Sequence, residues 1–401
     1  MTKHARNHAD DLRGATSLAM EAIQGVTELI EAMHVTIASG PAILGQPFAG
    51  PVRAATRPVY AMIQGVMQLV GGGIDLALAQ LVPVFGASSP GVEREAILAA
   101  LNGVLGDSLL ARDNPLAIEM RLRHGGQPLE LTREALHRAL PHATRKAVVL
   151  VHGLCMNDLQ WTRRGHDHGS ALARDLGYTP VHVHYNSGLH ISTNGHQLAA
   201  LLDQLVAAWP VALDELVLVG HSMGGLVARS ACHAGDVAGH AWRPQLRALI
   251  CLGSPHHGAP LERGGAWVDL ILGLSHYSAP LARLGKIRSA GITDLRFGDV
   301  LDEHWRGFDR FAHREDRRLP CPLPAGVQCY AIAATRGSEA DDPQASDGLV
   351  PVASALGLHA TSELTVAFPD EHRWIALETD HIGLLGAASV HEQLRSWLSS
   401  R

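Results

Sequence analysis

Short runs of consecutive apolar residues alternate with longer stretches of helical periodicity from residue 115 onward. The runs predict six buried strands, at 147–151, 180–185, 215–219, 246–252, 327–333 and 364–368. Continuous apolar strands separated by helices are typical of a parallel sheet whose two faces are covered by helices. Before them, residues 118–123 alternate apolar and polar side chains, and a Gly-containing turn leads to a returning segment at 128–131, which predicts a β-hairpin. The pattern therefore predicts an α/β fold.

Residues 1–112 have a different pattern, which predicts an N-terminal helical region. The segment IQGVTEL at 23–29 recurs forty positions later as IQGVMQL at 63–69. Polar residues form a helical stripe in the first copy and a thinner one in the second. The second helix therefore has more apolar surface to bury. We expect two amphipathic helices that pack on each other or on the following domain. Attachment to a membrane surface, in the plane of the interface, is the alternative.

The composition is that of a folded globular protein. Of the 401 residues, 46% are hydrophobic, which excludes disorder for most of the chain. The formal net charge of −6, with dispersed basic residues, excludes a nucleic-acid binder. Five cysteines without a CxxC pair predict free thiols, and a disulfide between Cys321 and Cys329 is the alternative if the protein is exported. The 25 histidines include no HExxH pair, so we expect neither a metal ion nor a cofactor.

The sequence indicates neither a leader nor a membrane span. Residues 1–14 are polar, with no apolar segment directly behind them. The most apolar N-terminal stretch, 59–82, is interrupted by three glycines at 71–73 and by Asp75. We therefore expect a cytoplasmic protein, with membrane-surface association through the N-terminal helices as the alternative. The sequence leaves the oligomeric state open.

A nucleophile-elbow sequence follows the strand predicted at 215–219. The segment GHSMG at 220–224 has the G-x-S-x-G pattern, and the residues after it continue as a helix. The turn from strand to helix is so tight that its serine takes a strained backbone conformation, and glycines are needed where a Cβ would collide. Ser222 is therefore the candidate nucleophile.

A serine hydroxyl needs a general base and an acid that orients the base, and in this type of fold both follow the serine. His381, in TDHIGLL after the last predicted strand, is the candidate base, and Asp347, in SDGLVP, is the candidate acid. Residues of the same types lie nearby as rivals: His359 and His372 for the base, and Asp341, Asp342 and Asp380 for the acid.

The strand predicted at 147–151 runs directly into the sequence HGL, where a loop can supply an oxyanion hole. The backbone N–H groups of Leu154 and Met223 are the candidate donors. Five further residues are candidates for the substrate pocket: His152, Gly153, Cys155, His221 and Trp267. We expect His152 to brace the loop, because His381 already fills the role of base.

Together, HGL, GHSMGG, LGSPHHGAP, SDGLVP and DHIGLL resemble the α/β-hydrolase superfamily. Within it, the chain is similar to bacterial lipases with a His-Gly-Leu oxyanion loop and to the lipase-like group that includes GPI inositol-deacylases. The resemblance covers about residues 145–398 and implies a mostly parallel eight-stranded sheet with helices on both faces, a triad of Ser222, His381 and Asp347, and ester hydrolysis. The chain departs from it in its added N-terminal helical extension, and in the absence of an export signal and a clear disulfide pair.

These features predict an α/β-hydrolase domain over 113–401 with a cap insertion at about 260–320, where the apolar segment 266–274 suits acyl chains. The expected function is cleavage of carboxylic esters, of lipid or acyl type, through an acyl-enzyme. A thioesterase or an intracellular polyester depolymerase would use the same triad. From another class, an idle hydrolase fold would act as a lipid-binding module.

Overall fold

The computed structural model describes residues 92–258, 289–310, 315–339, 342 and 344–399. The chain divides into two compact units, and the second, made of Glu95–Ala111 and Ala117–Arg401, contains the fold and the candidate site. The N-terminal repeat and most of the predicted cap, including the segment 266–274 and Trp267, lie outside the described residues.

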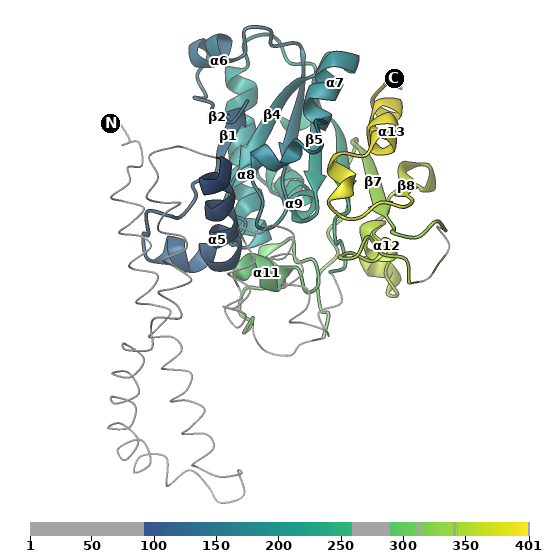
Figure 1. The fold of residues 1–401 in the computed structure, drawn as a ribbon. Helices are drawn as coiled ribbons and strands as arrows, with labels where there is room; N and C mark the ends of the chain where they lie inside the picture. Colours follow the sequence, from purple (N-terminus) through teal and green to yellow (C-terminus); the bar gives the residue numbers. More distant parts are fainter. Residues whose placement is uncertain (1–91, 259–288, 311–314, 340–341, 343, 400–401) are drawn as a thin grey trace, which may run out of the picture. The chain divides into compact units, whose positions relative to one another are not determined.

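One eight-stranded sheet, in the order β2-β1-β4-β3-β5-β6-β7-β8, organises this unit (Figure 1). β1 runs antiparallel to β2 and β4, and all other neighbouring strands are parallel. The strands are β1 (Arg121–His124), β2 (Gln127–Pro128), β3 (Lys146–Val151), β4 (Thr179–His184), β5 (Glu215–His221), β6 (Leu246–Leu252), β7 (Gln328–Ala334) and β8 (Arg373–Ala376).

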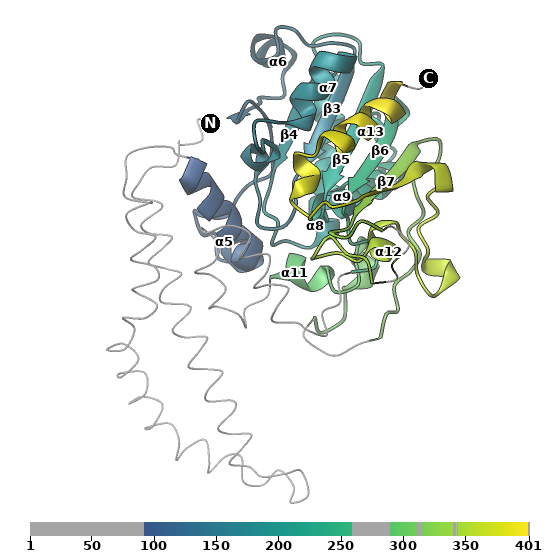
Figure 2. The same ribbon diagram turned by 45° about the vertical axis from the view of Figure 1, so that its right-hand side comes forward.

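Helices cover both faces of the sheet. α7 and α13 lie together over one face, and α8 and α9 pack together on the other (Figure 2). The sheet carries apolar side chains on both faces, and Val148, Val217 and Ile250 are fully buried beneath α7 and α13. The helices are α5 (Val92–Ala111), α6 (Arg133–Ala139), α7 (His168–Leu176), α8 (Ile191–Ala208), α9 (Met223–Ala238), α11 (Ala290–Asp294), α12 (Val352–Ala355) and α13 (Ala388–Ser399).

The structure confirms the α/β fold and the β-hairpin predicted at 118–131. It also confirms five of the six predicted parallel strands, with ends shifted by up to two residues. The sixth strand, predicted at 364–368, is wrong. Val366 and Phe368 are buried there, but the Val366 N–H donates to the carbonyl of Gly357 at 2.8 Å, so the segment packs under the turn after α12. The last strand is β8, a short edge strand with three partly exposed residues.

α5 falls inside the region 1–112 that the sequence assigns to the N-terminal extension, yet most of it belongs to the second unit. The Asn102 carboxamide oxygen accepts the Ile118 N–H at 2.8 Å. A Cβ at Gly106 would collide with the side chain of Asn186, in the loop after β4. The compact unit therefore begins within α5.

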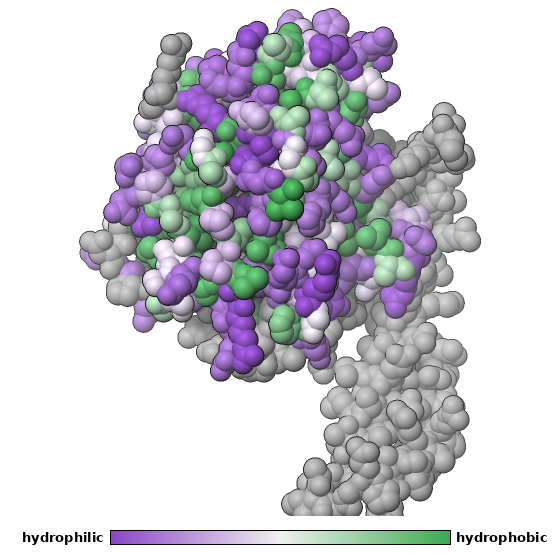
Figure 3. Space-filling view, turned by 180° about the vertical axis from the view of Figure 1, so that it is seen from behind, coloured by the Kyte–Doolittle hydropathy of each residue, from purple (hydrophilic) through white to green (hydrophobic). Residues whose placement is uncertain are grey.

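The described surface mixes polar and apolar side chains. On the face shown in Figure 3, hydrophobic residues are interspersed among hydrophilic ones. Among the described helices, none combines the length and the apolar character that crossing a membrane requires. The five cysteines are free thiols, and four of them are buried.

Candidate active site

Ser222 lies in the turn between the end of β5 and the start of α9. Its backbone has φ 56° and ψ −126°, a conformation that a residue with a side chain adopts only under strain. The Ser222 N–H donates to the carbonyl of Leu252 at the end of β6, at 2.8 Å, which holds the turn against the sheet. The sharp turn predicted from the G-x-S-x-G pattern is present.

The two glycines of this pattern are required by close backbone approaches. A Cβ at Gly220 would collide with the backbone of Gly225 in the first turn of α9. A Cβ at Gly224 would collide with the carbonyl oxygen of Val151 at the end of β3. The glycines thus let α9 begin directly above the carboxyl ends of β3 and β5.

Asp347 and His381 form a buried hydrogen-bonded pair. The His381 Nδ1 donates to Asp347 Oδ2 at 2.6 Å, while Oδ1 accepts the backbone N–H groups of Leu349 and Val350 at 2.8 and 2.7 Å. Burial alone would raise the pKa of Asp347, but the imidazole and the two N–H donors outweigh it and hold this pKa below its usual range. Asp347 is therefore ionised at neutral pH and fixes the ring of His381.

His221 ties the segment of His381 to the nucleophile turn. Its Nε2 donates to the backbone carbonyl of His381 at 3.0 Å, and the two rings lie 4.8 Å apart between centroids. Burial lowers the pKa of His221 to about 3, so the ring is neutral at pH 7 and its one N–H is used in this bond. Because His221 directly precedes Ser222, the bond brings the base and the nucleophile to the same edge of the sheet. The sequence pointed to His221 only as a pocket residue.

Gly253, the residue after β6, is a member of this site that the sequence analysis missed. It has φ +58°, and a Cβ there would lie 3.3 Å from both Asp347 Oδ2 and His381 Nδ1 and only 2.7 Å from Leu384. Glycine therefore leaves room for the acid–base pair. Its position in LGSPHHG, immediately after a predicted strand, was the available signal.

The loop after β3 passes directly beside the nucleophile. A Cβ at Gly153 would lie 3.0 Å from the Ser222 Cβ. Leu154 and Met223 are buried, and within the described part of the chain no acceptor is bonded to either backbone N–H. These two amides are available to a negatively charged oxygen beside Ser222.

His152 braces this loop from below. Its Nδ1 donates to the Gly153 carbonyl at 2.8 Å, its ring stacks on Tyr185 at 4.3 Å, and the Tyr185 hydroxyl donates to the His152 carbonyl at 2.7 Å. Burial lowers the pKa of His152 to about 3, so the ring is neutral. A neutral, packed imidazole fits a structural role.

One known family matches part of the chain that forms the sheet and the nucleophile turn. Residues 142–319 match the model of a family described as PGAP1-like alpha/beta domain. The sheet is mostly parallel, and the strained serine stands between β5 and the helix that follows it. The fold is that of an α/β-hydrolase. Among curated proteins no match was found.

Several solved structures are similar in fold to this chain. The mature form of a Bacillus licheniformis lipase is 17% identical, with 70% of this chain and 97% of that chain covered and a TM-score of 0.43. A Pyrococcus furiosus esterase is 14% identical, covering 64% and 83% with a TM-score of 0.36. A thioesterase from the prodiginine biosynthetic pathway in Streptomyces coelicolor is 16% identical, covering 65% and 91% with a TM-score of 0.34.

The rival candidates for the acid and the base lie in other environments. His372 bonds through Nδ1 to the Cys329 carbonyl at 3.1 Å, and His359 lies 3.7 Å from Asp316. Asp380 is exposed and accepts the Gly383 N–H. Asp342 accepts the N–H of a neighbouring loop residue, and Asp341 lies outside the described residues.

Of the remaining pocket candidates, Cys155 packs its side chain against α5. Its thiol packs against Gly103, and burial raises its pKa to about 12, so it is a packed, protonated thiol. Trp267 lies outside the described residues. A group of three histidines that could hold a metal ion lies elsewhere, between α7 and α13.

Proposed function

We propose that the protein is a serine hydrolase that cleaves carboxylic esters through an acyl-enzyme on Ser222. The observation that carries the proposal is the 2.6 Å bond between His381 and the ionised Asp347, in a segment that His221 anchors to the nucleophile turn. Binding alone requires neither this pair nor a strained serine beside free backbone N–H groups.

In the proposed reaction, His381 Nε2 takes the proton of the Ser222 hydroxyl as its oxygen attacks the ester carbonyl. Asp347 stabilises the imidazolium that forms. The N–H groups of Leu154 and Met223 bind the negatively charged oxygen of the tetrahedral intermediate. His381 then gives the proton to the departing alcohol, and a water molecule releases the acid by the same steps, returning the proton to Ser222.

For the substrate, we propose lipid or other acyl esters. The support is the apolar segment 266–274 in the sequence of the predicted cap, together with the amphipathic N-terminal repeat. A cytoplasmic enzyme that meets its substrate at a membrane surface would use both features. Flotation of the full chain with anionic phospholipid vesicles tests the surface attachment, and failure to float at low salt would contradict it.

An activity panel tests the proposed reaction. Purified protein should hydrolyse p-nitrophenyl esters and react with a fluorophosphonate probe that labels activated serines. A rate that rises with acyl chain length supports lipid esters, and a higher kcat/KM for acyl-CoA than for every oxygen ester would mean a thioesterase. No labelling and no hydrolysis by folded protein would contradict the proposal and favour a lipid-binding module.

A further inference from the structure

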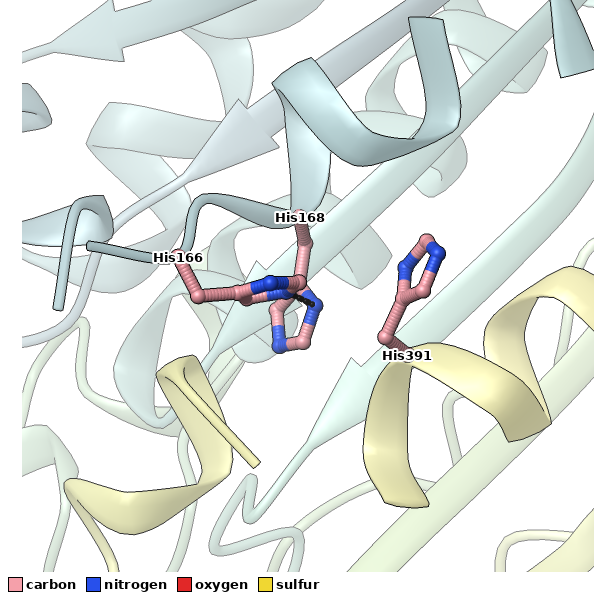
Figure 4. Close-up of side chains that lie close together, drawn as sticks. All are labelled: His166, His168 and His391. Carbon is pink, nitrogen blue, oxygen red and sulfur yellow. Dashed lines mark hydrogen bonds between the residues drawn. The ribbon is translucent and has the colours of Figure 1, made fainter. Parts of the chain in front are cut away.

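Three imidazoles meet outside the candidate active site, at the junction of α7 and α13. His166 comes from the turn before α7, His168 is the first residue of α7, and His391 lies in the first turn of α13 (Figure 4). One nitrogen of each ring can be chosen so that all three lie within 4.8 Å of one another. No local motif links these three residues, because His391 is far from the other two along the chain.

Two of these histidines have ring tautomers fixed by hydrogen bonds from Nε2, the ring nitrogen on the outer side, which faces away from the group. His168 Nε2 donates to the Leu384 carbonyl at 2.9 Å, and His391 Nε2 donates to the Asp175 carboxylate at 2.8 Å. Since a carbonyl and a carboxylate only accept, the Nδ1 atom of each neutral ring carries a lone pair. An outer carbonyl or carboxylate that holds a histidine in this way is a regular feature of metal sites.

The inner side of the group is incompletely satisfied by protein. His168 Nδ1 accepts from His166 Nε2 at 2.9 Å, the bond drawn in Figure 4. The third inner nitrogen, His391 Nδ1, is buried and has no hydrogen-bond partner among the described residues, and His391 is only 8% exposed. A buried polar atom without a partner is costly, and here it lies beside two other imidazoles.

We propose that His166, His168 and His391 bind one divalent late transition-metal ion, of which Zn²⁺ is the representative. Three imidazole nitrogens suit zinc, copper, nickel or cobalt and not calcium or magnesium, which prefer oxygen ligands. Tetrahedral zinc with bonds of 2.0–2.1 Å holds its ligands roughly 3.4 Å apart. The widest gap of 4.8 Å must therefore shrink by about 1.4 Å, which small side-chain rotations supply.

Binding also requires a change in His166, because its Nε2 proton occupies the bond to His168. That proton moves to Nδ1 by exchange with water, which leaves the ring neutral and the number of protons unchanged. His166 is the one partly exposed member of the group, so it is accessible to solvent. The exposed side also leaves a fourth coordination position for water.

A bound ion would fasten three parts of the fold. It would join the turn before α7 to α13 and, through the His168 bond to Leu384, hold the segment that follows His381. Leu384 is fully buried beside Gly253, which itself faces the acid–base pair. We therefore expect the metal to raise thermal stability, a readout that does not depend on the proposed esterase activity.

The experiment uses the full chain without an affinity tag, dialysed against EDTA and then freed of EDTA. Added Zn²⁺ should bind with a stoichiometry of one ion per chain and raise the Tm by a few degrees, whereas Mg²⁺ should not. Co²⁺ should produce the visible absorption bands of a tetrahedral or five-coordinate site. His166→Ala, at the partly exposed position, and His391→Phe, which removes the buried lone pair, should each lose the Tm response and the Co²⁺ spectrum.

His142→Ala is the matched control, since His142 is an exposed histidine outside the group and the variant should respond as the wild type does. A Tm response and spectrum that persist in folded His166→Ala and His391→Phe would overturn the proposal and assign the binding to other histidines. Absence of stoichiometric Zn²⁺ and Co²⁺ binding by the wild-type chain would overturn it as well.

Discussion

His381 is held at three points, one on its ring and two on its backbone, where its N–H donates to the Asp347 carbonyl at 3.1 Å. Asp347 accepts from Nδ1, and His221 donates to the carbonyl oxygen from the residue that precedes the nucleophile. The bond from Nδ1 fixes the tautomer that leaves Nε2 free to act as a base. The bond from His221 ties the His381 backbone to the residue that precedes Ser222.

The bond from His221 to the His381 carbonyl predicts that His221 positions the base. A substitution that keeps an N–H donor at this place should preserve the role. His221→Leu removes the donor and should lower kcat by about tenfold to a hundredfold with little change in KM, because a small displacement of the base is costly. His221→Gln keeps an N–H at similar reach and should recover most of the rate. His372→Leu, at a histidine outside the site, is the control. Equal rates for the Leu and Gln variants would contradict this role.

Two Gly→Ala variants, at Gly253 and Gly177, separate the effect of a Cβ on activity from its effect on backbone strain. Gly253→Ala places a Cβ against the acid–base pair and at a positive φ, whereas Gly177→Ala has a positive φ with open space around its Cβ. Gly177→Ala should lose about 1 kcal/mol of stability, since its conformation disfavours a side chain, and Gly253→Ala should lose more because its Cβ also meets Leu384. Only Gly253→Ala should lose kcat. A Gly253→Ala enzyme with an unchanged kcat, measured beside the Gly177→Ala variant, would show that the pair needs no such space.

At the scale of elements, the site depends on how helices are held against the sheet. α13 follows the segment of His381 and packs its buried side chains, including Leu394, into the core that contains Val217 and Ile250. The α13 core therefore supports the position of the base from its C-terminal side. Wrong packing there would displace His381 without changing any residue of the triad.

Truncating a buried side chain of α13 measures how much the packing of this helix stabilises the fold. Leu394→Ala should lower the free energy of unfolding by about 2–5 kcal/mol, because it removes a fully buried side chain and leaves a cavity. Val237→Ala, at a residue that is 76% exposed, should change it by less than about 0.5 kcal/mol. Urea denaturation gives both values, and equal effects would mean that α13 is loosely packed.

The strands show which elements a sequence can and cannot predict. β3, β5 and β6 are buried on both faces, so their continuous apolar runs were sufficient. β8 has partly exposed residues at the sheet edge, and its sequence RWIA begins with a charge. The segment 364–368 was more apolar than β8 because Val366 and Phe368 fill space under a turn, and hydrophobicity alone does not separate that case from a strand.

The same limit applies to the site. Ser222, Asp347 and His381 could be proposed because each lies in a local motif after a strand. The bond from His221 to His381 joins residues 160 positions apart, and the three-histidine group depends on how α13 packs on the turn before α7. Such contacts follow from packing and not from local pattern.

Over the whole molecule, many histidines are buried in neutral form, which predicts loss of stability in mild acid. Burial lowers the pKa of His152 and His221 to about 3, and of His257 and His304 to about 4. In the unfolded chain these rings bind protons below about pH 6.5, whereas the folded rings do not until the pH reaches their lowered pKa. Stability is therefore full above pH 6.5 and falls as the pH drops toward 4.

Each such ring can remove up to about 1.4 kcal/mol of stability per pH unit in this range. Urea midpoints at pH 7, 6 and 5 should decrease steeply, and the gap between the wild type and His304→Gln should change in favour of the variant as the pH falls. A midpoint that stays constant from pH 7 to 5 would contradict the neutral state of these rings.

The proposed role of Ser222 as the nucleophile of an ester hydrolase is tested most directly by one kinetic measurement. The rate of Ser222→Ala is measured on a p-nitrophenyl ester that the wild type hydrolyses. The variant should keep the fold, checked by circular dichroism and its Tm, because the Ser222 hydroxyl makes no capping bond to the first turn of α9. The kcat of Ser222→Ala should be about 10⁴-fold lower than that of the wild type, or lower still. A folded Ser222→Ala protein that retains a tenth of the wild-type rate would contradict this role.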